Sequence, residues 1–164
     1  MIRKFKEVQT WGTVIVLETF SDSESNLQKA LDECETFLYK IDDLFSTFKS
    51  NSQLSQLRQG ETAIENCDKL IVDVWNLSQT LKTQTNSAFD PWSVKDGVDF
   101  SGIVKGWAAD KCCEIFSAHN VKNCLVNAAG DISVRGKRHL NNQLTPWKIG
   151  IRDPRSANKV LHEF

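Results

Sequence analysis

The sequence lacks the features that define several large classes of protein. Its 164 residues have a formal net charge of −1 and no cluster of Lys and Arg, which argues against a nucleic-acid-binding surface. The longest apolar run near the start, Val14 to Leu17, is too short to cross a bilayer, and no secretory signal pattern accompanies it. We therefore expect no nucleic-acid partner, no membrane insertion and a cytoplasmic protein.

The cysteines are too few and too irregularly spaced for a disulfide framework or a zinc site. There are five, an odd number without CxxC spacing: Cys34, Cys67, Cys112, Cys113 and Cys124. Three of them fall in apolar-periodic segments, where a thiol serves as a small core side chain. We expect free thiols in a reducing compartment, in agreement with a cytoplasmic location.

What the sequence does contain is the pattern of one globular domain. Hydrophobic residues make up 40% of the chain and charged residues 25%, which is ordinary for such a domain. Residues 5–20, rich in Val, Thr and aromatic residues, predict a long strand or a hairpin edge. Further strands are predicted at residues 124–127, 132–135, 147–152 and 160–164.

Apolar residues spaced three and four apart predict three long helices. The first follows N-cap candidates at Ser21 to Ser23, and its core face consists of Leu27, Leu31, Cys34, Leu38, Ile41 and Leu44. The second begins at Asp68, the third spans about residues 103–119, and a short helix carries Leu54 and Leu57. Because helices alternate with strands, we predict an α+β (α/β mixed) fold in which helices flank a mixed sheet.

The stretch from residue 88 to residue 110 holds the densest group of candidate functional residues. It combines glycine, lysine and aspartate, and it leads into the third predicted helix, whose first N–H groups suit an anionic ligand. Gly102 and Gly106 would let the backbone approach that ligand, Lys105 would supply charge for a phosphate, and Asp99 could accept from a sugar or a base.

The pattern around Lys105 differs from the dinucleotide-binding GxGxxG motif and from the GxxxxGK[ST] motif of P-loops. The residues alone therefore leave two interpretations open. Either a phosphate-bearing ligand binds at this helix start, or Gly102 merely begins the helix and Lys105 is solvated.

Six short segments carry a resemblance to a known family. The most specific is Asp99 to Asp110 (DFSGIVKGWAAD), which matches the family pattern DxGGIAKGYAxD. The others are WGT at 11–13, FSTF with SQLSQL at 45–57, AFDP at 88–91, LVNAAGDI at 125–132 and WKIGIRDP at 147–154. On these motifs the chain resembles the ApbE family, the FAD:protein FMN transferases, and most closely its soluble, non-lipoprotein bacterial members.

The resemblance implies an enzyme that binds FAD and Mg²⁺. Such proteins transfer the FMN moiety of FAD to a Thr or Ser hydroxyl of an acceptor protein and release AMP. The positions that match FAD contacts of the family are Trp11, Phe48, Ala88, Phe89, Asp90, Asp99 and Lys105. Gly102 matches a position whose backbone carbonyl binds the metal, and no catalytic residue is assigned. Asp110 and Asp131 are interpreted as structural residues.

The chain also departs from the family pattern. Trp11 replaces a Met, Ala129 replaces a Gly, and the family's remaining metal ligands and its histidine segment have no counterpart before Phe164. We therefore expect residues 1–164 to be the N-terminal and central part of a single ApbE-like domain whose C-terminal part is absent. Two alternatives stay open: a Mg²⁺-dependent FAD pyrophosphatase that yields FMN and AMP, and a non-catalytic flavin-binding fragment.

Overall fold

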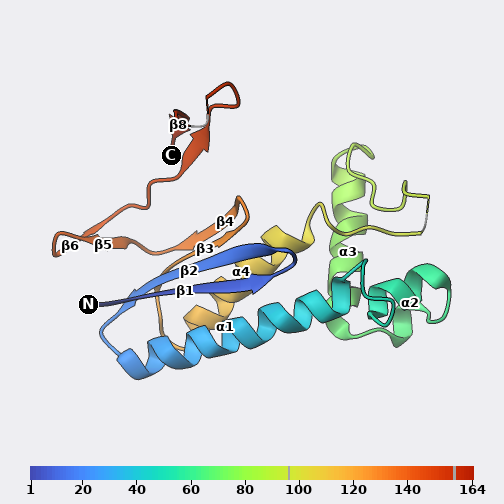
Figure 1. Cartoon of the computed structure of the whole chain (residues 1–164), viewed down its shortest axis with the longest axis horizontal. Helices are drawn as coiled ribbons and strands as arrows, with labels where there is room; N and C mark the ends of the chain where they lie inside the picture. The colour runs from blue at the N-terminus through green and yellow to red at the C-terminus, as the bar shows by residue number, and fades with distance from the viewer. Residues whose placement is uncertain (96, 157) are drawn as a thin grey trace.

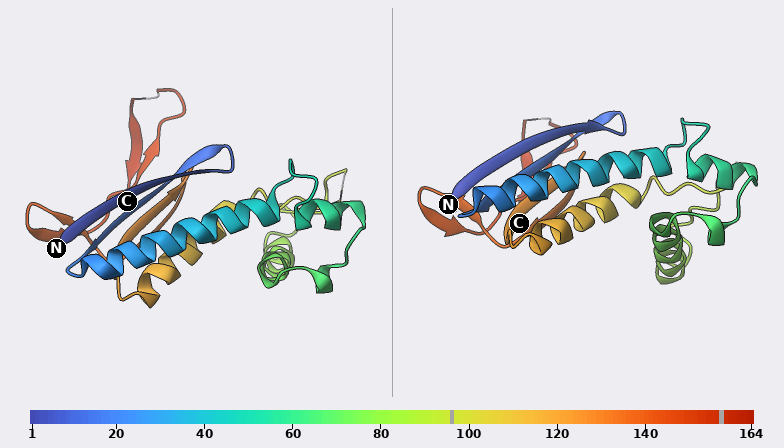
Figure 2. Two further views of the ribbon diagram at one scale, coloured as in Figure 1. Left: turned by 60° about the horizontal axis from the view of Figure 1, so that its bottom comes forward. Right: turned by 90° about the horizontal axis from the view of Figure 1, so that it is seen from below.

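An antiparallel sheet with two long helices on one face forms the body of the chain (Figure 1). The computed structural model describes residues 1–95, 97–156 and 158–164. The sheet has four strands in the order β1-β2-β3-β4, which are Ile2–Thr10, Thr13–Ser21, Asn123–Ala128 and Asp131–Arg135. Helix α1 (Glu24–Phe45) lies over β1 and β2, and α4 (Val104–Ala118) lies over β3 and β4 (Figure 2).

Alternating burial along the strands explains why the helices cover one face only. Ile15 and Leu17 on β2 stand opposite Ala128 and Val126 on β3, so these four buried side chains share a face of the sheet. The α+β class is thereby confirmed. The sheet was expected to be mixed, but all three described ladders are antiparallel, because two-residue turns join β1 to β2 and β3 to β4.

The predicted strand over residues 5–20 is a hairpin of two strands. Its turn is Trp11-Gly12, where φ is 56° and 68°, a left-handed pair that matches the twist of antiparallel strands. The sequence signal was weak, because a bulky residue such as Trp seldom adopts a positive φ and the usual Asn-Gly pair is absent.

The C-terminal end of α1 extends beyond the sheet and packs against a separate helical layer (Figure 1). This layer consists of α2 (Gln53–Gln59), the 3-10 turn Ile64–Asn66 and α3 (Lys69–Gln84). Its apolar side chains form a second core cluster with the end of α1 and with the segment just before α4: Ile41, Phe45, Leu54, Ile71, Val74, Val98 and Phe100. No described helix combines the length and the apolar character needed to span a bilayer.

Side-chain caps begin three of these helices, two of them where the sequence predicts them. The Ser23 hydroxyl accepts from the backbone N–H of Asn26, and the Asp68 carboxylate accepts from that of Leu70. Ser52 caps α2 in the same way. These bonds satisfy N–H groups that have no partner inside the helix.

Two small hairpins follow the sheet. The first pairs β5 (Arg138–Leu140) with β6 (Gln143–Thr145), and the second pairs β7 (Gly150–Arg152) with β8 (Val160–Glu163). The β7–β8 hairpin projects from the body of the chain (Figures 1 and 2). The strand predicted at 147–152 is shorter than expected, because Trp147 packs against Phe20 with ring centroids 5.9 Å apart and so lies outside the ladder.

Leu38 tests the packing of α1 on the sheet. Its side chain is fully buried in the cluster between helix and sheet, so Leu38→Ala should lower the free energy of unfolding by about 2–5 kcal/mol. The exposed Lys29 on the same helix provides the control, and Lys29→Ala should change it by less than about 0.5 kcal/mol. Urea denaturation followed by circular dichroism measures both, and equal effects would contradict the assigned core.

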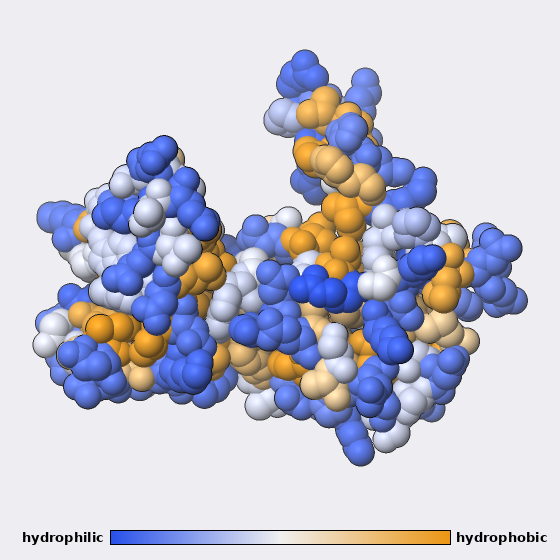
Figure 3. Space-filling view, turned by 180° about the vertical axis from the view of Figure 1, so that it is seen from behind, coloured by the Kyte–Doolittle hydropathy of each residue, from blue (hydrophilic) through white to orange (hydrophobic). Residues whose placement is uncertain are grey.

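The projecting hairpin predicts self-association. Figure 3 shows apolar side chains on the hairpin, where Ile151, Val160, Leu161 and Phe164 are all exposed. Because an apolar surface next to free strand edges favours association, the apparent mass in light scattering should rise with protein concentration. Leu161→Lys should weaken that rise, whereas a monodisperse monomer over the whole concentration range would refute the prediction.

Candidate functional site

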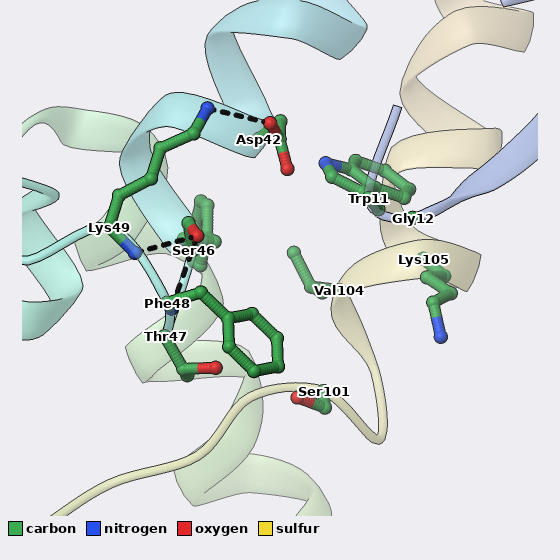
Figure 4. A pocket seen from close by; sticks show the side chains of 11 residues that line it. Trp11, Gly12, Asp42, Ser46, Thr47, Phe48, Lys49, Ser101, Val104 and Lys105 are labelled. Carbon is green, nitrogen blue, oxygen red and sulfur yellow. Dashed lines mark hydrogen bonds and ion pairs between the residues drawn. The ribbon is translucent and has the colours of Figure 1, made fainter. Parts of the chain in front are cut away.

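A cavity of about 420 Å³ opens next to the end of α1 (Figure 4). The β1–β2 turn, the loop that follows α1 and the start of α4 enclose it. Its lining combines aromatic, hydroxyl and charged side chains: Trp11, Gly12, Asp42, Phe45, Ser46, Thr47, Phe48, Lys49, Ser101, Val104 and Lys105.

The loop after α1 is held by its own serines. The Ser46 hydroxyl accepts from the backbone N–H groups of Phe48 and Lys49 at 3.3 and 3.2 Å. The Ser46 carbonyl in turn accepts from the hydroxyls of Ser52 and Ser55 at 2.6 and 3.2 Å. These bonds explain the serines of the FSTF and SQLSQL motifs, because they fix the loop that presents Phe48 to the cavity.

Two aromatic side chains lie on different sides of the cavity. Trp11 comes from the hairpin turn and Phe48 from the loop after α1 (Figure 4). Phe48 is 98% exposed, so its ring contacts almost nothing in the chain. Exposed aromatic faces of this kind can stack on a planar ring of a ligand.

Two lysines bring positive charge to the cavity in different ways. Lys49 pairs with Asp42 and Asp43 at 2.7 and 2.6 Å, and its hydrogen bond to Asp42, followed by that to Asp43, raises the pKa of its ammonium group. Lys105 stands in the first turn of α4, a helix start with no side-chain cap. Lys105 is therefore the residue placed to meet an anionic group, since it adds its charge to the positive end of the helix dipole.

Thr10, next to Trp11, does not line this cavity but lines a neighbouring one. Thr10 is 8% exposed, and its hydroxyl oxygen has no hydrogen-bond partner among the described residues. A buried hydroxyl without a partner is costly, so a ligand or a water molecule that reached it would be stabilised.

The structure separates the residues that the sequence nominates for FAD. Trp11, Phe48 and Lys105 line the cavity. The other FAD candidates (Ala88, Phe89, Asp90 and Asp99) and the metal candidate Gly102 belong to the segment between α3 and α4 and do not line it. The family motifs therefore locate the cavity, but only in part.

Local contacts account for the nominated residues outside the cavity. Asp90 pairs with Lys82 at 2.7 Å and accepts from the backbone N–H of Trp92, and these bonds, that to Lys82 first, lower the pKa of its carboxyl group. Asp99 accepts from the backbone N–H of Ser101 at 2.8 Å. Ala88 is exposed in the turn after α3.

Phe89 explains the glycine at position 102. A Cβ atom on Gly102 would lie 3.2 Å from Cε2 of Phe89, so a larger residue would push the ring away. This contact joins the turn after α3 to the start of α4.

Sequence reasoning missed most of the polar lining. Asp42, Thr47, Lys49 and Ser101 were not nominated, although two of them adjoin nominated positions in the same motifs. The signal that could have found Thr47 is its place inside FSTF, between a buried and an exposed Phe.

Side chains that commonly bind metals do not cluster in the described part of the chain. Within residues 1–95, 97–156 and 158–164, no three His, Cys, Asp or Glu side chains gather to hold a metal ion. The Asp110 carboxylate accepts a hydrogen bond from the Ser133 hydroxyl at 2.6 Å and forms an ion pair with Arg135 at 3.5 Å. A single carbonyl at Gly102 does not satisfy Mg²⁺, which requires about six oxygen ligands in octahedral geometry.

The fold and the matched sequence together define the class of this protein. A family model described as the ApbE family matches residues 11–96 and 92–163. The apbe protein of Thermotoga maritima superposes with a TM-score of 0.82 at 17% identity, over 99% of this chain and 67% of that one, so the two share a fold. The class is that of α+β proteins with the architecture of the solved ApbE structures. The chain belongs to the ApbE family.

Curated relatives match over shorter segments. The FAD:protein FMN transferase of Vibrio cholerae is 32% identical over 67 residues, which is 41% of this chain and 19% of the relative. That of Treponema pallidum is 31% identical over 67 residues, or 38% of this chain and 18% of the relative. The matched part thus spans about a fifth of the length of these relatives.

Lys105 provides a direct test of the site. If its ammonium group contacts a phosphate of FAD, Lys105→Ala should weaken FAD binding by about 1.5–3 kcal/mol, which is at least about tenfold in Kd. The matched control is Lys111→Ala, because Lys111 lies on the same helix, pairs with Glu114 and does not line the cavity. Titration of flavin fluorescence measures both variants. Equal FAD affinities of the two variants would show that Lys105 does not contact FAD.

Proposed function

We propose that this chain binds FAD and takes part in the transfer of the FMN moiety to a Thr or Ser hydroxyl of an acceptor protein, with release of AMP. The observation that carries the proposal is the cavity of about 420 Å³ that Trp11, Phe48 and Lys105 line. The chain that forms this cavity belongs to the ApbE family. The names of the curated relatives support the same reaction.

The chemistry of the lining supports a flavin nucleotide. Trp11 and Phe48 offer aromatic faces to a planar ring, while Lys105 and the start of α4 offer positive charge to a phosphate. Thr47 and Ser101 add hydroxyl groups to the lining. A ligand with a flat ring at one end and a charged phosphate at the other matches this arrangement.

We further propose that the transfer depends on Mg²⁺, which would offset the charge of the pyrophosphate and of the AMP leaving group. Since Gly102 is the one metal position that the family resemblance assigns within residues 1–164, other parts of a complete domain would bind the ion. Residues 1–164 would then be the N-terminal and central part of a single flavin transferase domain of a cytoplasmic protein. The 67% of the Thermotoga maritima chain that is covered supports this assignment.

Two further candidates remain within the proposal. The first is a non-catalytic flavin-binding fragment, which would bind FAD in this cavity without transferring FMN. A Mg²⁺-dependent FAD pyrophosphatase would use the same cavity with water as the acceptor. The acceptor distinguishes the two enzymes, because only transfer leaves flavin on a protein.

A chimera tests the transfer itself. The chain is joined to the part of the Thermotoga maritima protein that it does not cover, and the chimera is mixed with FAD, Mg²⁺ and candidate acceptor proteins. We expect covalent flavin fluorescence on an acceptor band in a denaturing gel, with one AMP released for each flavin attached. Free FMN without any labelled acceptor would favour the pyrophosphatase.

The 164-residue chain alone should bind FAD but release no AMP from it in the presence of Mg²⁺, because a single neutral oxygen cannot anchor the ion. Chromatographic detection of AMP and equilibrium binding of FAD measure the two parts separately. Mg²⁺-dependent AMP release by the monomeric chain would contradict the prediction and would direct the search to Asp90, Asp99, Asp110 and Asp131.

A further inference from the structure

Four of the five cysteines lie in the layer between the helices and the sheet. Cys34 on α1, Cys112 and Cys113 on α4 and Cys124 on β3 are all completely buried. The Cys34 thiol donates to the backbone carbonyl of Cys112 at 3.6 Å. Cys113 points to the sheet instead, where its sulfur lies 3.6 Å from that of Cys124. The proposed flavin chemistry uses none of these thiols.

We propose that Cys113 and Cys124 form a redox pair, in which an oxidant of the peroxide class converts two thiols into a disulfide that ties α4 to β3. The pair is a modification site separate from the cavity, and it does not depend on the flavin assignment.

The geometry favours this pairing over any other. The two sulfurs are in van der Waals contact and need to approach by about 1.5 Å to form a bond of about 2.05 Å. Cys112 precedes Cys113 by one position, so its side chain leaves the helix in a different direction. Cys67 lies outside this layer, in the loop between the 3-10 turn and α3.

The surroundings of Cys113 favour its thiolate. The Cys124 thiol donates to the Cys113 sulfur, and this bond, with the nearby Ser133 hydroxyl and the charge of Arg135, lowers the pKa of Cys113 to about 7 although burial opposes the shift. The same bond raises the pKa of Cys124. A thiolate is the form that attacks an oxidant, so Cys113 is the attacking residue of the pair.

A polar path leads from this thiol toward solvent. Ser133 lies on β4, the edge strand of the sheet, and its hydroxyl donates to the exposed carboxylate of Asp110. Arg135 donates to the Ser133 oxygen at 3.3 Å. A molecule as small as hydrogen peroxide can approach Cys113 along these side chains when the edge strand opens locally.

The reaction balances with peroxide alone. The Cys113 thiolate attacks one oxygen of hydrogen peroxide, the O–O bond breaks, and the departing hydroxide takes a proton to become water. The Cys124 sulfur then attacks the sulfenic acid on Cys113, the S–S bond forms, the S–O bond breaks, and the second hydroxide leaves as water with the Cys124 proton. Two thiols lose two electrons and two protons, and peroxide is reduced to two waters.

Trypsin digestion can locate the bond without any change to the pair. Cleavage at Lys111, Lys122 and Arg135 places Cys112 and Cys113 on one peptide and Cys124 on the next. The experiment uses the folded chain with Cys67→Ser, which removes the cysteine outside the buried layer and leaves four thiols. After hydrogen peroxide treatment we expect two titratable thiols and a cross-link between these two peptides that thiol reductants remove.

Two matched variants distinguish the partners, because Cys112 and Cys113 are neighbours with equal burial. Cys112→Ala should keep the cross-link and lose two of its three remaining thiols to peroxide, whereas Cys113→Ala should keep all three. Circular dichroism checks that each variant is folded. If a variant does not fold, the digest of the parent chain still tests the proposal. The proposal is overturned if the parent keeps four thiols, if the bond involves Cys34 or joins Cys112 to Cys113, or if it forms only in urea.

Discussion

The packing of Trp107 between two phenylalanines of α1 is the contact on which the arrangement of this chain depends. Its ring centroid lies 6.1 Å from that of Phe37 and 6.3 Å from that of Phe45, and Phe45 in turn contacts Phe100 at 6.1 Å. Trp107, Phe37 and Trp11 pack against both core clusters. Because aromatic rings bury large areas and prefer tilted contacts, this group joins the sheet layer to the helical layer at a defined angle.

The candidate site is a consequence of that junction. Helix α1 is too long for the sheet it covers, so its end meets the start of α4 and the β1–β2 turn away from the sheet (Figures 1 and 4). Polar groups gather there because the backbone must turn: Ser46 closes the end of α1, and the left-handed Trp11-Gly12 pair closes the hairpin. The aromatic and charged side chains that line the cavity are therefore held by rigid elements on several sides.

The thiol layer and the cavity share two elements: α1, which carries Cys34 and Asp42, and α4. The first turn of α4 carries Val104 and Lys105 into the cavity, and its later turns carry Cys112 and Cys113 into the core. The buried face of α4 in this core consists of Ala108, Ala109, Cys112, Cys113 and Phe116.

The sequence by itself determined the long helices and two of their caps, the positions of the strands of the main sheet and the family. These features depend on neighbours in the chain: the spacing of Leu27, Leu31 and Leu38, the hydroxyl of Ser23 and the motif around Lys105 are local. Tertiary structure alone decided the rest. It paired β2 with β3 in antiparallel fashion and moved Trp147 out of its predicted strand. It also separated Asp90 and Asp99 from the cavity and brought the sulfur of Cys113 to 3.6 Å from that of Cys124. All four outcomes involve distant segments or competing partners. The local pattern of a chain does not encode such distances, because they are set by how whole layers pack on one another.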